Sequence, residues 1–205
     1  IIGATGKSGQ KLTVEAIERG LDVTAIVRDA SKLTHSVKAI EKSILDLTTE
    51  DIQQFDVVIN TFAAPLTEAE QYVVMGKHLI SIFKDVSTRL IVIGGAGRLF
   101  VDEAATIQVF DTPDFPDFLV PSSKKQFDSY LELKASSVKW TYVSPSAFYD
   151  PEGIRTGKYT VGSDQLLVNS TGESYVSYAD LAVAIIDAAV NEDYIGTAIT
   201  VVGEK

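Results

Sequence analysis

The sequence has 205 residues, no cysteine and a formal net charge of -10. This length suits one domain with a full core, and the lack of cysteine excludes disulfides, thiolate catalysis and cysteine-bound zinc. The acidic balance argues against nucleic acid and anionic membranes, and no apolar run approaches the ~20 residues of a membrane span. We expect a cytoplasmic monomer or homodimer that forms a single domain over residues 1–205. His35 and His78 stand alone, so we expect no metal site.

The chain opens on Ile1-Ile2, which is too short for a strand by ~3 residues, so we expect some natural residues before it. Apolar side chains then recur at helical spacing after Gly9 and end before Gly20, which suits a helix terminator. A run rich in β-branched residues over 22–27 predicts the next strand.

The same alternation of strands and helices continues to the end of the chain. Continuous apolar strands between amphipathic helices predict an α/β fold, with a doubly wound, mostly parallel sheet covered on both faces. Residues 98–122 are irregular and rich in proline and phenylalanine, which is typical of a pocket wall or lid. Residues 151–176 predict a small hairpin excursion on the substrate side. The further strands are expected over 40–45, 56–59, 90–93, 138–143 and 198–202, and the further helices over 68–84, 123–135 and 177–188.

The stretch Gly3-Ala4-Thr5-Gly6-Lys7-Ser8-Gly9 lies between the first strand and the first helix. Glycines at this place let a strand turn sharply and let a helix N-terminus direct free N–H groups at a pyrophosphate. The spacing differs from G-x-G-x-x-G, so an ordinary tight turn remains an alternative. A P-loop is excluded because its first glycine would fall at position 1, where isoleucine stands.

Other motifs lie at or near the ends of the later strands. They are Ala25-Ile26-Val27-Arg28, Ile93-Gly94-Gly95-Ala96-Gly97, Trp140-Thr141-Tyr142-Val143-Ser144-Pro145 and Gly157-x-Tyr159. With the glycine stretch they resemble the atypical short-chain dehydrogenase/reductases, which are Rossmann-fold proteins, and the resemblance covers almost the whole chain. Within that family the sequence is most similar to the single-domain NADH-flavin reductases, which are related to NmrA-like and biliverdin reductase B-like proteins.

The resemblance implies a nicotinamide dinucleotide cofactor and assigns positions to it. An acidic residue after the second strand would bind the ribose hydroxyls of NAD, whereas a guanidinium pairs with the 2′-phosphate of NADP. Arg28 therefore favours NADP, with NAD possible and a solvated arginine as the alternative. The other cofactor positions are Gly3, Thr5, Gly6, Lys7, Ser8 and Gly9 at the pyrophosphate, Asp46 and Leu47 at the adenine, and Thr61, Phe62 and Ala63 at the ribose.

No catalytic residue is assigned. The family's usual acid is the tyrosine of Y-x-x-x-K, helped by a serine after the fifth strand. Tyr130 and Lys134 have that spacing, but Tyr130 lies near its helix end, so we interpret it as core packing with Phe127.

Glycines stand where the family's serine is expected. Gly94 and Gly95 would make room for two planar ring systems, and Pro145 would border the nicotinamide. Phe148 and Tyr149 follow the sixth strand and would line the acceptor pocket, with ordinary loop packing as the alternative.

Two functions fit these features. The first is an NAD(P)H-dependent reductase that delivers hydride to a planar acceptor such as a flavin or quinone, with solvent supplying the proton. The second is a catalytically silent, NmrA-like sensor of NADP(H) that binds a protein partner. The small C-terminal part argues against a sugar-nucleotide epimerase.

Overall fold

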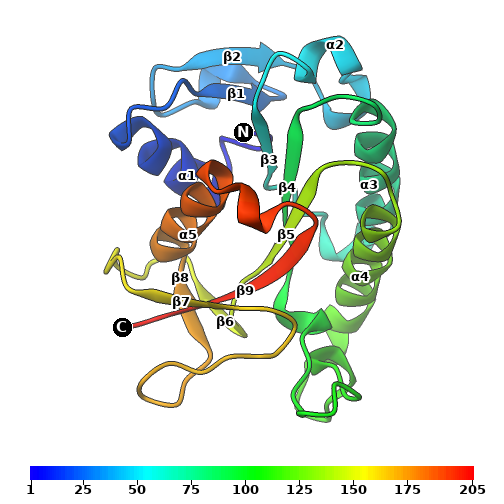
Figure 1. Ribbon diagram of the computed structural model, residues 1–205, viewed down its shortest axis with the longest axis vertical. Helices are drawn as coiled ribbons and strands as arrows, with labels where there is room; N and C mark the ends of the chain where they lie inside the picture. The colour runs from blue at the N-terminus through cyan, green and yellow to red at the C-terminus, as the bar shows by residue number, and fades with distance from the viewer.

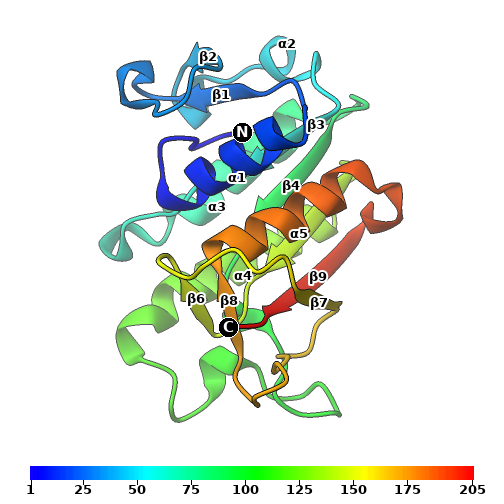
Figure 2. The same cartoon turned by 90° about the vertical axis from the view of Figure 1, so that its left-hand side faces the viewer.

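The computed structural model describes residues 1–205 and places helices on both faces of a twisted sheet (Figure 1). Helices α1 and α5 cover one face, and α3 and α4 cover the other, as the rotated view also shows (Figure 2). None of the helices has the length and apolarity needed to cross a membrane. The helices are α1 (Lys7–Glu18), α2 (Thr49–Ile52), α3 (Gln71–Ile82), α4 (Val120–Lys134) and α5 (Tyr178–Val190). The strands are β1 (Thr24–Val27), β2 (Lys38–Glu41), β3 (Val57–Asn60), β4 (Arg89–Ile93), β5 (Trp140–Ser144), β6 (Phe148–Asp150), β7 (Tyr159–Gly162), β8 (Tyr175–Ser177) and β9 (Thr197–Gly203).

The sheet is mostly parallel. Strands β3, β4, β5 and β9 pair in parallel, β7 adds an antiparallel edge to β9, and β1 pairs in parallel with β2. Ile2 joins the two groups because it bridges Ile26 of β1 on one side and Asn60 of β3 on the other. The predicted doubly wound Rossmann fold is thus confirmed. The chain leaves Ile2 toward β1 and returns to β3, so the strand order reverses at Ile2, and ligands bind at such a reversal.

Two hydrophobic cores hold the helices to the sheet. On one face Leu79 and Phe83 pack with Trp140, which is 7% exposed. On the other face Leu12 of α1 packs with Leu181 and other residues of α5. Strand β5 is buried along its whole length because helices cover both sides of it. These cores position the carboxyl ends of the strands at one edge of the molecule.

Some element boundaries differ from the prediction. The strand expected over 40–45 is β2, which ends at Glu41, and a 3-10 turn follows over Ile44–Asp46. The turn lets Ile44 and Leu47 both enter the core, which an extended strand would not allow because its side chains alternate. Helix α4 begins at Val120 rather than at residue 123. Pro121 lies in its first turn, where the missing N–H group is not needed.

The hairpin expected over residues 151–176 does not form. Strand β7 pairs with β9, and β6 pairs in parallel with β8 across the segment, so neither strand pair closes within it. The open edge of β9 offers β7 a longer partner than the segment itself provides. The buried carboxylate of Asp180 accepts hydrogen bonds from the backbone N–H groups of Thr156 (2.9 Å) and Gly157 (2.7 Å). These bonds hold the segment against the start of α5.

Candidate functional site

The glycine turn at residues 3–9 has a geometry that side chains would prevent. Gly3 has φ +78°, and a Cβ atom there would lie 2.6 Å from the Thr61 Oγ1. A Cβ atom on Gly9 would overlap the carbonyl oxygen of Gly3. Because both glycines lack this atom, α1 approaches the end of the central strand closely. The turn therefore has the form that a bound pyrophosphate needs.

The N-terminus of α1 offers free backbone donors. Gly6 caps the helix without a side-chain hydrogen bond, and the first helical bond is from the Gln10 N–H to the Gly6 oxygen at 2.9 Å. The N–H groups of residues 7–9 thus lack partners within the helix. No acidic residue lies in this turn, and Lys7 adds a positive charge to the helix dipole. The arrangement favours an anion.

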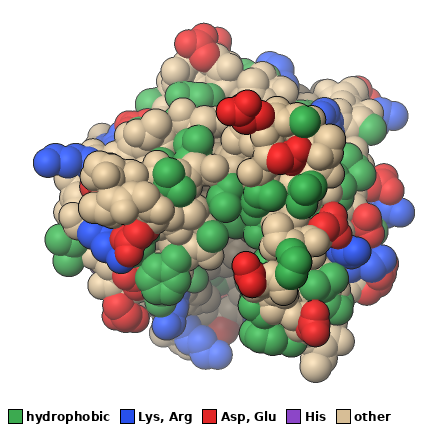
Figure 3. Space-filling model, turned by 90° about the horizontal axis from the view of Figure 1, so that it is seen from below, with side chains coloured by type: hydrophobic (Ala, Val, Ile, Leu, Met, Phe, Trp, Pro, Cys, Tyr) green, Lys and Arg blue, Asp and Glu red, His purple; other side chains and the backbone are tan.

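A cavity of about 330 Å³ lies beside this helix end, at the carboxyl edge of the sheet. Strands β4 and β5 run downward in Figure 1, and the face seen from below is hollowed in its middle, with hydrophobic side chains gathered around the hollow (Figure 3). The cavity brings together residues that the sequence predicted separately. These are Ser8, Thr61, Phe62, Ala63, Gly94, Gly95, Pro145 and Tyr149.

Other predicted residues lie outside the cavity. Phe148 is 58% exposed and packs on Tyr175, with ring centres 5.9 Å apart, so its assignment to the acceptor pocket is wrong. The reason is the alternation of side chains along β6, which turns Tyr149 inward and Phe148 outward. Asp46 is exposed and accepts a hydrogen bond from Ser43 (2.6 Å), while the Leu47 side chain is buried in the core. The Leu47 backbone is engaged as well, since its N–H group donates to the Ile44 oxygen (3.2 Å) and its oxygen is hydrogen-bonded to the His78 Nε2 (3.0 Å).

Arg28 follows β1 and extends into solvent without an ion pair. Its neighbour Asp29 is engaged, since its carboxylate accepts hydrogen bonds from the Ser31 hydroxyl (2.6 Å) and N–H (3.1 Å) and contacts Lys32 (3.3 Å). The Ser31 hydroxyl and Lys32 hold the pKa of Asp29 below its usual value. At the end of β1 the Asp29 carboxylate thus binds neighbouring residues of its own loop, and the Arg28 guanidinium is free.

The glycines after β4 line the cavity and also pack against the chain's own side chains. A Cβ atom at Gly94 would overlap the Tyr142 ring, and one at Gly95 would lie 2.6 Å from the Gln126 Oε1. Their lack of a side chain thus lets Tyr142 and α4 pack closely against the strand end. That these glycines make room in the cavity for two planar ring systems stays a prediction.

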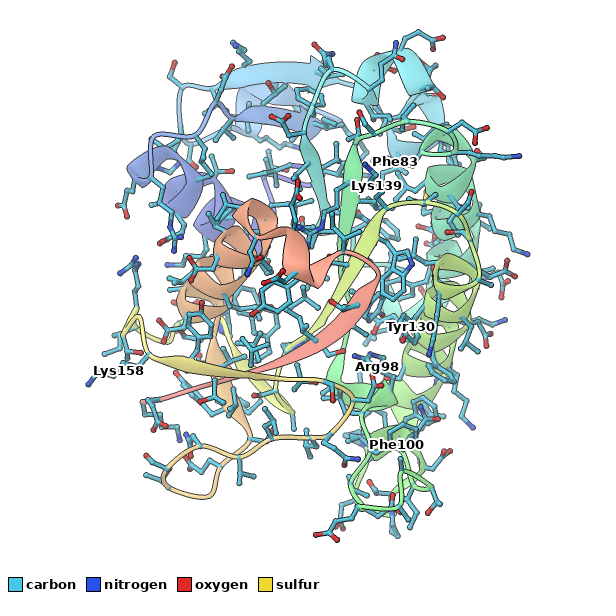
Figure 4. The ribbon with its side chains drawn as sticks, viewed as in Figure 1. Phe83, Arg98, Phe100, Tyr130, Lys139 and Lys158 are labelled. Carbon is cyan, nitrogen blue, oxygen red and sulfur yellow. The ribbon has the colours of Figure 1, made fainter.

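Tyr130 lies in the core, as predicted. It is 4% exposed and stacks on Phe127, with ring centres 6.1 Å apart. Figure 4 shows Tyr130 beside Arg98, whose guanidinium carbon lies 4.9 Å from the Tyr130 ring centre. Tyr130 does not line the cavity, so the Tyr130–Lys134 spacing does not form a catalytic pair there.

Several lining residues were not predicted individually. Phe115 and Leu119 come from the irregular segment 98–122, so the prediction of that segment as a pocket wall is confirmed. Gln126 and Tyr178 also line the cavity, and neither belongs to one of the predicted site motifs. The one signal for Tyr178 was Ser177, which the sequence placed at a helix start and which does cap α5 by accepting a hydrogen bond from the Asp180 N–H at 2.9 Å.

Two tyrosines are the only titratable side chains in the cavity wall. The hydroxyls of Tyr149 and Ser8 are hydrogen-bonded at 2.8 Å. Burial raises the pKa of Tyr149 far above its ordinary value, and burial also raises the pKa of Tyr178. Both side chains therefore stay protonated and neutral at physiological pH.

A family model described as NAD(P)H-binding matches residues 3–192 of the chain. The protein belongs to this NAD(P)H-binding family. It is 47% identical to the uncharacterized protein YwnB of Bacillus subtilis, over all of this chain and 97% of YwnB. SP1627 of Streptococcus pneumoniae, a candidate NADH-flavin reductase, superposes with a TM-score of 0.94 at 34% identity, over 99% of this chain and 97% of SP1627. ChuY of Escherichia coli O157:H7, an anaerobillin reductase, shares the fold at 17% identity and a TM-score of 0.73, over 100% of this chain and 96% of ChuY.

As a member of the NAD(P)H-binding family, the protein has a nicotinamide dinucleotide as its cofactor. The residues present fit such a group. The glycine turn has the space that only glycine leaves, and the start of α1 carries unpaired donors beside Lys7. The cavity at the carboxyl edge begins at Ser8 on the same helix, so it continues from the phosphate position toward the place where a nicotinamide would react.

Proposed function

We propose that this protein is an NADPH-dependent reductase that transfers hydride to a planar acceptor such as a flavin or quinone. The observation that carries this proposal is the uncharged cavity next to the free N-terminus of α1. No aspartate, glutamate, histidine, lysine or arginine lines this cavity. The name of SP1627, a candidate NADH-flavin reductase with the same fold at 34% identity, supports the reaction class.

The lack of a general base restricts the chemistry. The reduced cofactor, when bound, supplies a hydride, that is, one proton and two electrons. Oxidation of an alcohol, or reduction of a carbonyl to an alcohol, would need a group that exchanges the hydroxyl proton, and burial raises the pKa of both tyrosines in the wall and so disfavours their ionised form. Flavins and quinones instead accept hydride at an electron-poor ring atom, and the proton that completes the reduction comes from solvent. The cavity suits such acceptors.

The contribution of the chain is then position and exclusion of water. Phe62, Phe115 and Leu119 supply apolar walls from three different segments. Ser8 and Thr61 lie at the end near the glycine turn, where they orient the cofactor relative to these walls. Holding two reactants in a near-attack arrangement is worth several kcal/mol of the barrier, about 7 to 11 in well-oriented cases.

The cofactor is proposed to be NADPH rather than NADH because of Arg28. A free guanidinium pairs well with a 2′-phosphate, and these charge-assisted bonds are stronger than neutral ones. The adjacent Asp29 does not compete for the ribose hydroxyls, since Ser31 and Lys32 occupy its carboxylate.

The test is oxidation of NADPH by the purified protein with a panel of acceptors. The panel holds riboflavin, FMN, FAD and a simple quinone, and the loss of nicotinamide absorbance is followed. We expect turnover with at least one acceptor and slower turnover with NADH. A Gly9→Ala variant, in which the new side chain blocks the cofactor turn, should show no activity and so controls for contaminating reductases.

One outcome contradicts the reductase proposal directly. If the protein binds NADPH tightly in a direct binding measurement but oxidises it with none of the acceptors, the cavity does not support hydride transfer. That result would favour the sensor of NADP(H) redox state that acts through a protein partner.

A further inference from the structure

Tyr149 and Tyr178 form a stacked pair in the cavity wall. Their ring centres lie 3.7 Å apart and their planes are inclined by 26°. Both rings line the cavity, although they come from β6 and from the first turn of α5. Neither ring is part of the glycine turn or of the apolar walls formed by the segment 98–122.

The pair is held in place at both ends. The Tyr149 hydroxyl is hydrogen-bonded to Ser8, at the start of α1. Strand β6 is paired with β8, with Tyr149 opposite Val176, and β8 leads directly into α5. Tyr178 is therefore fixed by the Ser177 cap and by the same strand pair. Two tyrosines fixed in this way offer a rigid aromatic surface at little cost in side-chain entropy.

We propose that the Tyr149–Tyr178 pair is the surface on which the acceptor's ring stacks, with Tyr178 in contact with the acceptor and Tyr149 linking it to the cofactor helix through Ser8. This inference rests on the proposed reductase function and names its acceptor site. Stacking on an aromatic face tolerates different ring systems, because every planar conjugated ring presents a π-face. The site would thus select planar aromatic or quinoid rings as a class.

The charge of the cavity makes the inference more specific. No basic side chain lines it, so a phosphate on the acceptor finds no partner there. Phe115, which forms part of the wall, is flanked in the chain by Asp114 and Asp117, both exposed. A negatively charged tail would be repelled at this side. We therefore expect the acceptor to be recognised by its ring alone, and riboflavin to bind at least as tightly as FMN.

The experiment measures binding separately from turnover. Quenching of riboflavin fluorescence by the NADP-loaded protein gives the flavin affinity, and the affinity for NADPH is measured in parallel. Tyr178→Leu should weaken riboflavin binding about tenfold through loss of the stacked ring, and should leave NADPH affinity unchanged. Tyr178→Phe keeps the ring and should keep the flavin affinity.

Tyr194→Leu is the matched control, because Tyr194 follows the opposite end of α5 and does not line the cavity. Flavin affinity that falls in Tyr178→Leu alone supports the stacking surface, even if no acceptor turns over. Wild-type affinity in Tyr178→Leu overturns the inference but leaves the reductase proposal standing. An equal loss in Tyr178→Leu and Tyr194→Leu also overturns it, since the effect is then one of general stability. If the wild-type protein binds none of the flavins or quinones, both proposals fail.

Discussion

Arg28 is the residue on which the proposed preference for NADPH rests. It lies just beyond the buried run Ala25–Val27, so the end of β1 determines where its guanidinium can reach. The Arg28 guanidinium has no ion-pair partner in Asp29, because the Asp29 carboxylate binds Ser31 and Lys32. By accepting hydrogen bonds from Ser31, Asp29 caps the next turn.

Replacing Arg28 by alanine should weaken NADPH binding and leave NADH binding nearly unchanged. The expected loss for NADPH is about 1.5 to 3 kcal/mol, which is the usual worth of a hydrogen bond to a charged group. Isothermal titration with both cofactors measures it. Lys38→Ala is the control, because Lys38 lies at the amino end of the same strand pair, opposite Thr24. Equal weakening of both cofactors in Arg28→Ala would exclude a 2′-phosphate role.

At the scale of elements, the segment 151–157 is fastened to α1 as well as to α5. The carboxylate of Glu15, on α1, accepts hydrogen bonds from Arg155 through Nε (2.8 Å) and Nη2 (3.0 Å), and from the Arg19 Nε at 2.7 Å. The Glu15 side chain is 4% exposed. Arg19 also binds Asp187 on α5, which in turn accepts a hydrogen bond from Tyr159. One network therefore joins both helices to the segment that follows β6.

This network predicts a measurable sensitivity to acid. Hydrogen bonding to Arg155 is the largest of the effects that lower the pKa of Glu15 in the folded state. A carboxylate with a lowered folded pKa stabilises the protein fully above its unfolded value of ~4.3, and that contribution is lost as the pH falls through the folded value.

Arg155→Met should therefore reduce stability at pH 7 by about 1 to 2 kcal/mol, because Arg19 still pairs with Glu15 and Arg155 is half exposed. Below pH ~4 the difference from wild type should shrink, since protonated Glu15 gains less from either arginine. Urea unfolding at both pH values measures the two differences. Glu152→Gln, which removes the exposed Lys7 pair, should change stability by less than ~0.5 kcal/mol. A constant Arg155→Met difference across this range would contradict the assignment.

Prediction from the sequence succeeded where the signal is local. Gly3 predicts a turn, Gly9 predicts a close approach of the helix, and Ser177 predicts a helix start, each within a few residues of itself. The alternating apolar runs define the layers of the fold. Prediction failed where the structure depends on pairing between segments that are distant in the sequence. Phe148 faces solvent because of how β6 pairs with β8, and the 151–176 strands pair outside the segment because β9 has a free edge. Tyr178 enters the cavity only because α5 begins beside β6.

At the scale of the whole molecule, the site is assembled from most of the chain. Its lining runs from Ser8 to Tyr178 and draws on the ends of β3, β4 and β5 and on the starts of α1, α4 and α5. No part of the chain can form it before the sheet is complete. A ligand that binds there binds only the fully folded molecule.

Cofactor binding should consequently raise the melting temperature of the entire protein. NADPH at a hundredfold excess over its Kd adds about 2.7 kcal/mol, which corresponds to about 5 to 10 °C for a chain of this size. Thermal unfolding followed by fluorescence and by circular dichroism should show one coincident transition that moves as a unit. Two separated transitions, with only one moved by NADPH, would contradict this description. The Arg28→Ala variant should show a smaller shift with NADPH.

The contact between Gly94 and Tyr142 also limits how such a protein can change over evolution. A side chain at position 94 collides with the Tyr142 ring, so it is compatible only with a smaller residue at 142. Tyr142 is itself buried against Tyr130 and Arg98, and shrinking it opens a cavity. Each substitution is harmful alone, and they are tolerated only together. A serine at position 94 would therefore have to be accompanied by a smaller residue at position 142.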